Sequence, residues 1–327
     1  MKSLKIASLF LSAALILCLF AGCGKTGQKD TTVINIGGLK GPTTMGMVKL
    51  MEDCKDEDSD INCSFTVAAA ADELTPGFIK GELDVIAVPA NLASVLYNRT
   101  GGQTVLLAVN TLGVLYMVEK GDSVSSVQDL KGKTIYATGK GTTPEYALRY
   151  VLTSAGIDPD KDVTIEWKSE ATEVVGVLSK SDTGIAMLPQ PFVTVAQTSI
   201  PELRIALDMT EQWDKVGGEG KLVTGVLVAR KAFVEEHPSL VKKLLEKYAE
   251  STEYVNENPE QAATLIENVG IVKAAVAKKA IPYCNICCIT GSGMKQAVSG
   301  YLGVLYSLNP AAVGGNLPEN DFYYEGK

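Results

Sequence analysis

Short polar loops that follow apolar runs are the features of this sequence best suited to chemistry. Gly41 with Thr43 follows one such run, Asn91 follows another, and Gly141 with Thr142 follows a third. If a helix begins at each loop, its first N–H groups have no partner within the helix, and its dipole places partial positive charge there. Such helix ends attract anions and hydrogen-bond acceptors, so the loops predict a site for a small anionic or polar molecule.

All the candidate ligand-binding residues share one position: directly after a predicted strand or at the start of the following helix. In open α/β sheets, ligands bind at the carboxyl ends of the strands. Thr142 and Glu145 also have the spacing of a capping box. Any single member could serve only as a cap or turn residue, and the prediction therefore rests on their convergence. The set is Lys40, Gly41, Pro42, Thr43, Thr44, Ala71, Pro89, Ala90, Asn91, Asn110, Gly141, Thr142, Thr143, Gln190 and Phe192.

Signs of enzyme chemistry are weak. The chain has one histidine, His237, so the usual catalytic triads and histidine-rich zinc sites lack a component. Gly132-Lys133-Thr134 resembles the end of a phosphate-binding loop, but Val127 stands where the leading glycine is required. We expect no catalytic residue and no cofactor. The net charge of −8, without a long basic block, argues against a nucleic-acid partner.

The cysteines leave two questions open. Cys54 and Cys63 flank an acidic loop, and a disulfide between them would stabilise the fold by about 2–3 kcal/mol through loop closure. The residues alone do not decide whether that bridge forms. Cys284, Cys287 and Cys288 lack the second ligand pair of a zinc motif, so we predict small buried side chains and no metal.

The amino-terminal segment has the form of an export signal. Lys2 and Lys5 precede an apolar run over residues 6–20, which is too short for a membrane span. Residues 19–23 resemble a bacterial lipobox ending in Cys23, although Phe20 replaces the usual Leu, Val or Ile. We predict a signal peptide over 1–22, a tether over 23–32, and a lipid on Cys23 that anchors the protein outside the cytoplasm. Ordinary secretion with an incidental Cys23 is the alternative.

The remainder alternates β-rich runs with helical stretches, as in an α/β fold with mainly parallel strands. The pattern restarts half-way: Val85-Ile86-Ala87-Val88-Pro89 is echoed by Ile185-Ala186-Met187-Leu188-Pro189. Two lobes of similar build are therefore expected. We predict lobe 1 over 33–110 and lobe 2 over 111–221. The strands are expected at 33–39, 62–68, 85–88, 104–109, 134–137, 163–167, 183–187, 204–208 and 222–229, and the intervening helices at 42–54, 72–80, 90–98, 143–155, 172–179 and 192–198.

Beyond residue 229 the chain becomes helical, with helices predicted at 238–256, 259–268, 272–280 and 291–307. This block has no predicted sheet of its own and must pack on an existing lobe. We therefore expect residues 222–327 to return to lobe 1, so that two crossover strands form a hinge between the lobes.

Several motifs resemble those of the type II periplasmic binding proteins, in the branch that serves importers of nitrate, taurine, sulfonate and thiamine-pyrimidine precursors. They are Gly81-Glu82-Leu83-Asp84-Val85, Asp129-Leu130-Lys131-Gly132-Lys133, Gly141-Thr142-Thr143, residues 228–238 and Asn258-Pro259-Glu260. The resemblance implies a monomeric solute-binding subunit of an ABC importer, which delivers a small solute to a permease driven by a separate ATPase. It does not identify the solute.

Two other functions remain open. An enzyme of the same fold could act in thiamine-pyrimidine synthesis, although the export signal disagrees with a cytoplasmic activity. A sensor ectodomain is the third hypothesis, but no second membrane segment follows in this sequence to carry its signal.

Overall fold

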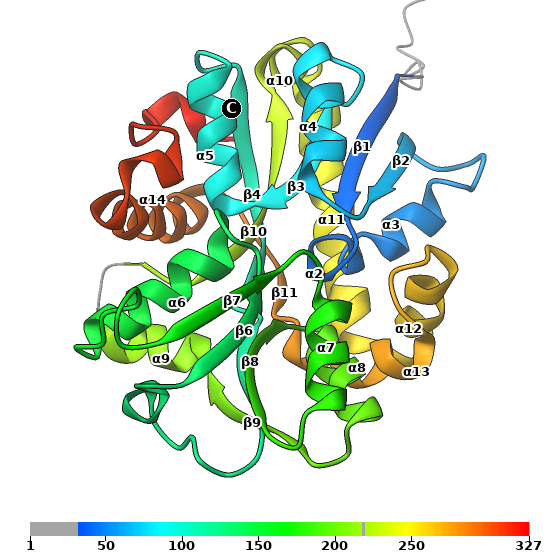
Figure 1. Ribbon diagram of the computed structural model, residues 1–327. Coiled ribbons are helices and arrows are strands. Elements are labelled where there is room, and N and C mark those ends of the chain that lie inside the picture. The colour runs from blue at the N-terminus through cyan, green and yellow to red at the C-terminus, as the bar shows by residue number, and fades with distance from the viewer. Residues whose placement is uncertain (1–31, 218–219, 327) are drawn as a thin grey trace, which may run out of the picture. The chain divides into compact units, whose positions relative to one another are not determined.

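The computed structural model describes residues 32–217 and 220–326. Within them, the strands build two sheets (Figure 1). The first has the order β11-β4-β10-β3-β1-β2 and the second the order β7-β6-β8-β5-β9. We call the first sheet with its helices lobe 1, and the second with its helices lobe 2. The α/β class and the two-lobed fold are as predicted.

The first half of the chain supplies most of lobe 1 and then enters lobe 2. Its elements alternate, as the sequence pattern predicts, from strand to helix. In order they are β1 (Val33–Leu39), α2 (Pro42–Met45), α3 (Val48–Asp53), β2 (Asn62–Ala68), α4 (Ala71–Lys80), β3 (Val85–Pro89), α5 (Ala90–Arg99), β4 (Thr104–Leu112) and β5 (Leu115–Lys120).

Lobe 2 follows, and the chain then returns to the first sheet. The lobe 2 elements are a 3₁₀ turn at Val127–Leu130, β6 (Thr134–Thr138), α6 (Thr143–Ser154), β7 (Thr164–Lys168), α7 (Ala171–Lys180), β8 (Gly184–Pro189), α8 (Phe192–Ser199), β9 (Leu203–Asp208) and α9 (Met209–Val216). The returning elements are β10 (Val223–Arg230), α10 (Lys231–Glu236), α11 (Pro238–Glu257), α12 (Pro259–Asn268), α13 (Ala274–Ala280), β11 (Ile286–Ile289) and α14 (Gly291–Leu308), with 3₁₀ turns at Ile281–Tyr283, Pro310–Val313 and Asn320–Phe322.

Strand directions are more mixed than predicted. The pairs β1–β2, β1–β3, β6–β7 and β6–β8 are parallel, but β10 runs antiparallel to β3 and β4, and β5 runs antiparallel to β8 and β9. The reason is the route of the chain. The chain passes from lobe 1 into lobe 2 through β5 and returns to lobe 1 through β10. Each of these two strands begins at the edge where its neighbouring strands end, so it runs antiparallel to them.

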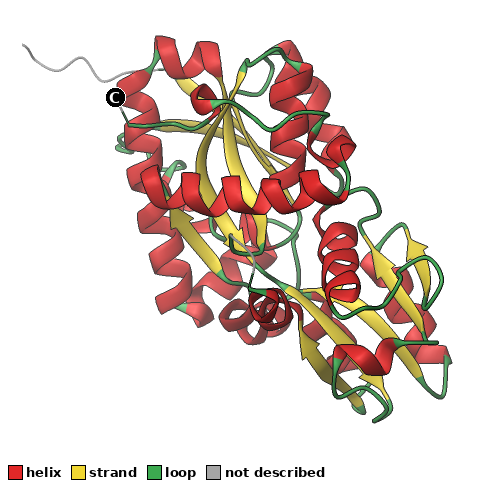
Figure 2. Ribbon diagram, turned by 90° about the vertical axis from the view of Figure 1, so that its left-hand side faces the viewer, coloured by secondary structure: helices red, strands yellow, loops and turns green. Residues whose placement is uncertain are grey.

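Helices cover both faces of each sheet, which explains why the central strands are buried on both sides (Figure 2). On lobe 1, α4, α5 and α14 share one core, whereas α3 and α11 share another. On lobe 2, α6 and α9 cover one face, and α7 and α8 cover the other. The echoed segments β3 and β8 occupy equivalent places, each between a parallel strand and an antiparallel one.

Three local predictions were wrong. The helix predicted over 42–54 is divided into α2 and α3 at Gly46, where an added Cβ would lie 2.9 Å from Ile286 Cγ2 and 3.2 Å from Tyr248 Oη. The helical block does contribute a strand, β11, which joins the sheet beside β4. β5, α9 and α10 were missed because short elements carry few periods of an apolar pattern.

Candidate functional site

The topology brings the strand ends of the two lobes to the same place. β4 ends at Leu112 and β5 begins at Leu115, so only two residues separate the sheets at this crossing. β5 begins opposite the end of β8, where Leu115 pairs with Pro189. The Gln190 backbone N–H donates to Val114 O at 2.9 Å. The carboxyl ends of the lobe 1 strands and of the lobe 2 strands therefore both border the crossing.

In lobe 1, the short helix α2 lies across the strand ends and contacts β1, β3, β4, β10 and β11. Asn110 Nδ2 donates to Thr43 O at 3.3 Å, and Thr43 Oγ1 donates to Leu39 O at 3.3 Å. A Cβ on Gly225 would lie 2.5 Å from both Asn110 Oδ1 and Thr43 Cγ2. Only glycine therefore fits on β10 between these two predicted residues.

Among the described residues, six buried side-chain oxygens have no hydrogen-bond partner; five of them lie around these strand ends, and the sixth, Tyr248 Oη, lies beside the Asn110 side chain. Gly225 pairs with Thr111 on one side and with Pro89 on the other, so the ends of β4, β10 and β3 are adjacent. Unpaired buried polar atoms are rare and costly in folded proteins, so each of these oxygens needs a partner, which a water molecule or a ligand can supply. We call these residues the polar edge: Thr44, Asn91, Asn110, Thr111 and Thr224.

Two members of the polar edge, Thr111 and Thr224, were not predicted. Thr111 is fully buried and lies one residue after Asn110, beyond the predicted end of that strand. Thr224 lies next to Gly225 on β10. A single threonine at the end of an apolar run is the only sequence signal for either residue. Many threonines share that signal.

The lobes touch at the amino end of α5. Asn91, 3% exposed, donates through Nδ2 to Gly141 O in lobe 2 at 3.4 Å and to Ala312 O at 3.2 Å. Two predicted loops, one from each lobe, are thus in direct contact. The neighbouring predicted residues Pro89 and Ala90 are the N-cap and the first residue of α5.

The lobe 2 loop does not form the expected capping box. Thr142 Oγ1 donates to Gly139 O at 2.7 Å and accepts no N–H from the helix. Glu145 instead accepts the Gly141 N–H at 2.7 Å, one residue before the N-cap. Gly141 has a φ of 78°, and this left-handed conformation turns its N–H toward the carboxylate. Thr143 is buried, and its hydroxyl is bonded to Tyr301 Oη at 2.8 Å.

The remaining predicted residues have structural partners. The Gln190 side chain accepts the Thr194 hydroxyl at 2.9 Å, and Phe192 packs against the lobe 2 core. Ala71 begins α4 beside the edge strand β2, and Glu73 already accepts the N–H groups of Ala69 and Ala70 before it. Lys40 is exposed, and Pro42 is half-buried as the first residue of α2.

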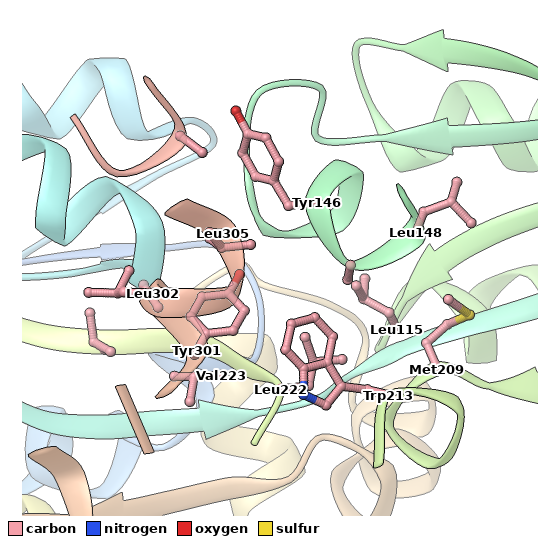
Figure 3. Close-up of a cluster of buried hydrophobic side chains, with 14 of the residues drawn as sticks. Leu115, Tyr146, Leu148, Met209, Trp213, Leu222, Val223, Tyr301, Leu302 and Leu305 are labelled. Atoms are coloured by element: carbon pink, nitrogen blue, oxygen red, sulfur yellow. The ribbon is translucent and has the colours of Figure 1, made fainter. Parts of the chain in front are cut away.

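An apolar cluster joins the lobes beside this site (Figure 3). Trp213 of α9 lies 5.6 Å from Tyr301 and 4.4 Å from Tyr150, measured between ring centroids. Burial raises the pKa of Tyr301 well above its usual value, and the bond to Thr143 acts in the opposite direction. Tyr301 therefore stays protonated at neutral pH.

The five cysteines within the described residues are all thiols. Cys54 and Cys63 lie close enough for a hydrogen bond between their side chains, which lowers the pKa of Cys54 and raises that of Cys63. Their disulfide stays a prediction. Burial raises the pKa of Cys287 to about 12 and that of Cys288 to about 11, so both are protonated and poorly reactive. Within residues 32–217 and 220–326, no three His, Cys, Asp or Glu side chains are grouped to hold a metal ion.

The predictions for residues 1–31, including the signal peptide and Cys23, lie outside the described residues. Among the helices of the described part, none has the length and apolar character needed to cross a membrane.

Comparison with known proteins agrees with this architecture. Residues 103–262 match the family described as NMT1/THI5 like. The structure aligns with an ABC transporter protein of Parabacteroides distasonis with a TM-score of 0.76 and 25% identity, covering 90% of this chain and all of the other. The chain therefore has the two-lobed α/β fold seen in periplasmic binding proteins.

Two further comparisons show the same likeness. The periplasmic aliphatic sulphonate binding protein SsuA of Escherichia coli shares its fold, with a TM-score of 0.71 at 15% identity over 90% of this chain and 93% of that one. A protein of Brucella abortus described as a binding protein is 25% identical over 195 residues. That match spans 58% of this chain and 59% of the Brucella protein.

Proposed function

We propose that this binding protein is the extracytoplasmic solute-binding subunit of an ABC importer, which captures a small polar solute between its lobes and delivers it to a permease. The observation that carries the proposal is the polar edge, whose five buried oxygens lack partners at the strand ends that border the interlobe crossing. Bound solute would supply the missing hydrogen bonds. The fold of the SsuA relative, a sulphonate binding protein, supports the same function.

The proposed site combines the polar edge with the predicted loops of both lobes. In lobe 1 these are Lys40 to Thr44 and Pro89 to Asn91, with Asn110, and in lobe 2 they are Gly141 to Thr143. Gln190, Phe192 and Ala71 complete the set as supporting residues. Asn91 and Gly141 touch directly, which supports a site that closes when the lobes meet.

The variant Thr111→Val tests whether the Thr111 hydroxyl binds the solute or only supports the fold. The Thr111 hydroxyl is buried without a partner, so replacing it by a methyl group should leave the free energy of unfolding of the ligand-free protein unchanged or raise it. The same change should weaken solute binding by about 1–3 kcal/mol, because the solute loses a buried hydrogen bond. Calorimetric titration with a solute found by thermal-shift screening measures the second effect, and urea denaturation measures the first.

Thr100→Val is the matched control. Its hydroxyl donates to Leu96 O at 2.7 Å near the end of α5, away from the polar edge. This change should lower stability slightly and leave binding alone. Normal affinity in Thr111→Val would remove the polar edge from the site. If no solute in a broad library stabilises the protein, the proposed function itself is wrong.

The competing enzyme function makes a different prediction for the same screen. A binding protein returns its solute unchanged, whereas an enzyme of this fold would convert it. Mass spectrometry of the compound recovered after overnight incubation separates the two. A sensor ectodomain would bind without turnover, but it would co-purify with a signalling partner in place of a permease.

Membrane anchoring is tested at Cys23. We propose that this thiol carries diacylglycerol, and Cys23→Ser should then release the protein from the membrane fraction. Fractionation followed by immunoblotting measures the distribution, and mass spectrometry of the mature amino terminus identifies the lipid. Cys18→Ser, within the predicted signal peptide, is the control and should leave the protein on the membrane. Retention of the Cys23→Ser protein would contradict lipidation.

A further inference from the structure

The hydrogen bonds of Asn91 fix the orientation of its side-chain amide. Nδ2 donates to two backbone carbonyls, Gly141 O and Ala312 O, and a carbonyl can only accept. Flipping the amide would bring three oxygens together, so Oδ1 must point the other way. That oxygen is buried and has no partner in the described chain. The amino end of α5 therefore carries a buried acceptor without a partner, next to the contact with lobe 2.

In the facing loop of lobe 2, one backbone donor is already occupied. The Gly141 N–H, which would otherwise attract an anion, is already bonded to the carboxylate of Glu145 at 2.7 Å. Glu145 is only 8% exposed, so its charge is poorly screened by water. Arg149 binds Glu145 at 2.9 Å, but it also binds Asp160 at 2.9 Å. The three groups together carry one negative charge.

Other charges near these loops act more weakly. Lys140 precedes Gly141 and Lys40 precedes Gly41, and both lysines are exposed. Exposed ammonium groups interact with a ligand through water, where charges are strongly screened. The contact between Asn91 and Gly141 thus brings together an amide oxygen, two backbone carbonyls and a buried carboxylate.

We infer that this site selects a solute bearing N–H or O–H donors, such as an amine or amide, and disfavours a fully deprotonated oxyanion, with Glu145 as the specificity-determining residue. This deepens the proposed function, on which it rests. It also departs from the sequence-based expectation of an anion, because the lobe 2 loop expected to bind the anion holds a carboxylate of its own.

Calorimetric titrations with ethanesulfonate test the role of Glu145. Wild-type protein should bind this oxyanion at least tenfold more weakly than Glu145→Ala, in which the Gly141 N–H and the Arg149 guanidinium are released. Glu173→Ala removes an exposed carboxylate from α7 in the same lobe and should behave as wild type. Glu145→Gln, which keeps an acceptor for Gly141 but removes the charge, should lie between the two and guards against misfolding of the alanine variant.

A second set of titrations compares the affinities of the wild-type protein for ethylammonium, acetamide and ethanesulfonate. At least one donor-bearing probe should bind tenfold more tightly than the oxyanion, at matched ionic strength. The inference is overturned if wild type prefers ethanesulfonate, if no donor-bearing probe reaches that margin, or if neither Glu145 variant gains oxyanion affinity. Those results would leave the proposed function intact, since it fails only when no solute of any class binds.

Discussion

Replacing Trp213 with alanine should lower the free energy of unfolding by about 3–5 kcal/mol. The indole is 2% exposed and packs between Tyr150 and Tyr301. Its Nε1–H donates to Gly220 O at 3.0 Å, on the second connection between the lobes. The variant therefore loses a large apolar contact and leaves a buried carbonyl without its donor. Urea denaturation followed by circular dichroism measures the loss.

Trp167→Ala is the matched control, because Trp167 is only half-buried on β7, where it packs at the margin of the same apolar cluster. We expect Trp167→Ala to lower the free energy of unfolding clearly less than Trp213→Ala does. If both variants lose the same free energy of unfolding, the packing of Trp213 between the lobes adds no more stability than that of a half-buried tryptophan. Because Trp213 supports Tyr301, which binds Thr143 at the start of α6, Trp213→Ala should also weaken solute binding.

Replacing Glu119 with glutamine should also destabilise the protein, by about 1.5–3 kcal/mol, because several buried hydrogen bonds lose their charged acceptor. The carboxylate accepts the Ser123 N–H at 2.8 Å, the Ser123 hydroxyl at 2.7 Å and the Val124 N–H at 3.1 Å. It also pairs with Arg204, which bridges to the same loop through Val124 O at 2.6 Å. Glutamine can accept from some of these donors but cannot pair with the guanidinium.

Glu119 also makes stability depend on pH. Burial alone raises its pKa, but the hydrogen bonds from Ser123 and Val124 and the contact with Arg204 outweigh burial, and the pKa is lowered overall. A lowered carboxyl pKa stabilises the fold above the unfolded-state value of about 4.3. That contribution is lost as the pH falls from there through the folded-state pKa. Urea midpoints measured from pH 7 to pH 3 should fall more steeply for wild type than for Glu119→Gln.

Glu173→Gln provides the comparison for Glu119, since its side chain is exposed on α7. It should change stability by less than about 0.5 kcal/mol and keep the wild-type pH profile. If Glu119→Gln loses stability at low pH as steeply as wild type does, other carboxylates dominate the loss of stability in acid.

Local patterns in the sequence predicted most of the elements and the type of fold. The runs at β3 and β8 are continuously apolar and end in proline, and both proved to be buried strands leading into helices. Pro238 and Pro259 mark helix starts because a missing N–H costs nothing in the first turn. These signals lie within a few residues of one another, so they can be recognised without knowledge of the fold. The resemblance of the loop motifs then indicated the family.

Only the tertiary structure decided how the candidate site residues are used. The sequence suggested that Thr142 and Glu145 cap each other, but Glu145 bonds to Gly141, and the neighbouring Thr143 bonds to Tyr301, 158 positions away. Asn91 reaches Gly141, 50 positions away, and Ala312, 221 positions away. A side chain takes the partner that folding brings nearest, and a local pattern does not contain that partner. The sequence could therefore suggest the strand ends as a candidate site, whereas the donors and acceptors left for a solute depend on long-range contacts.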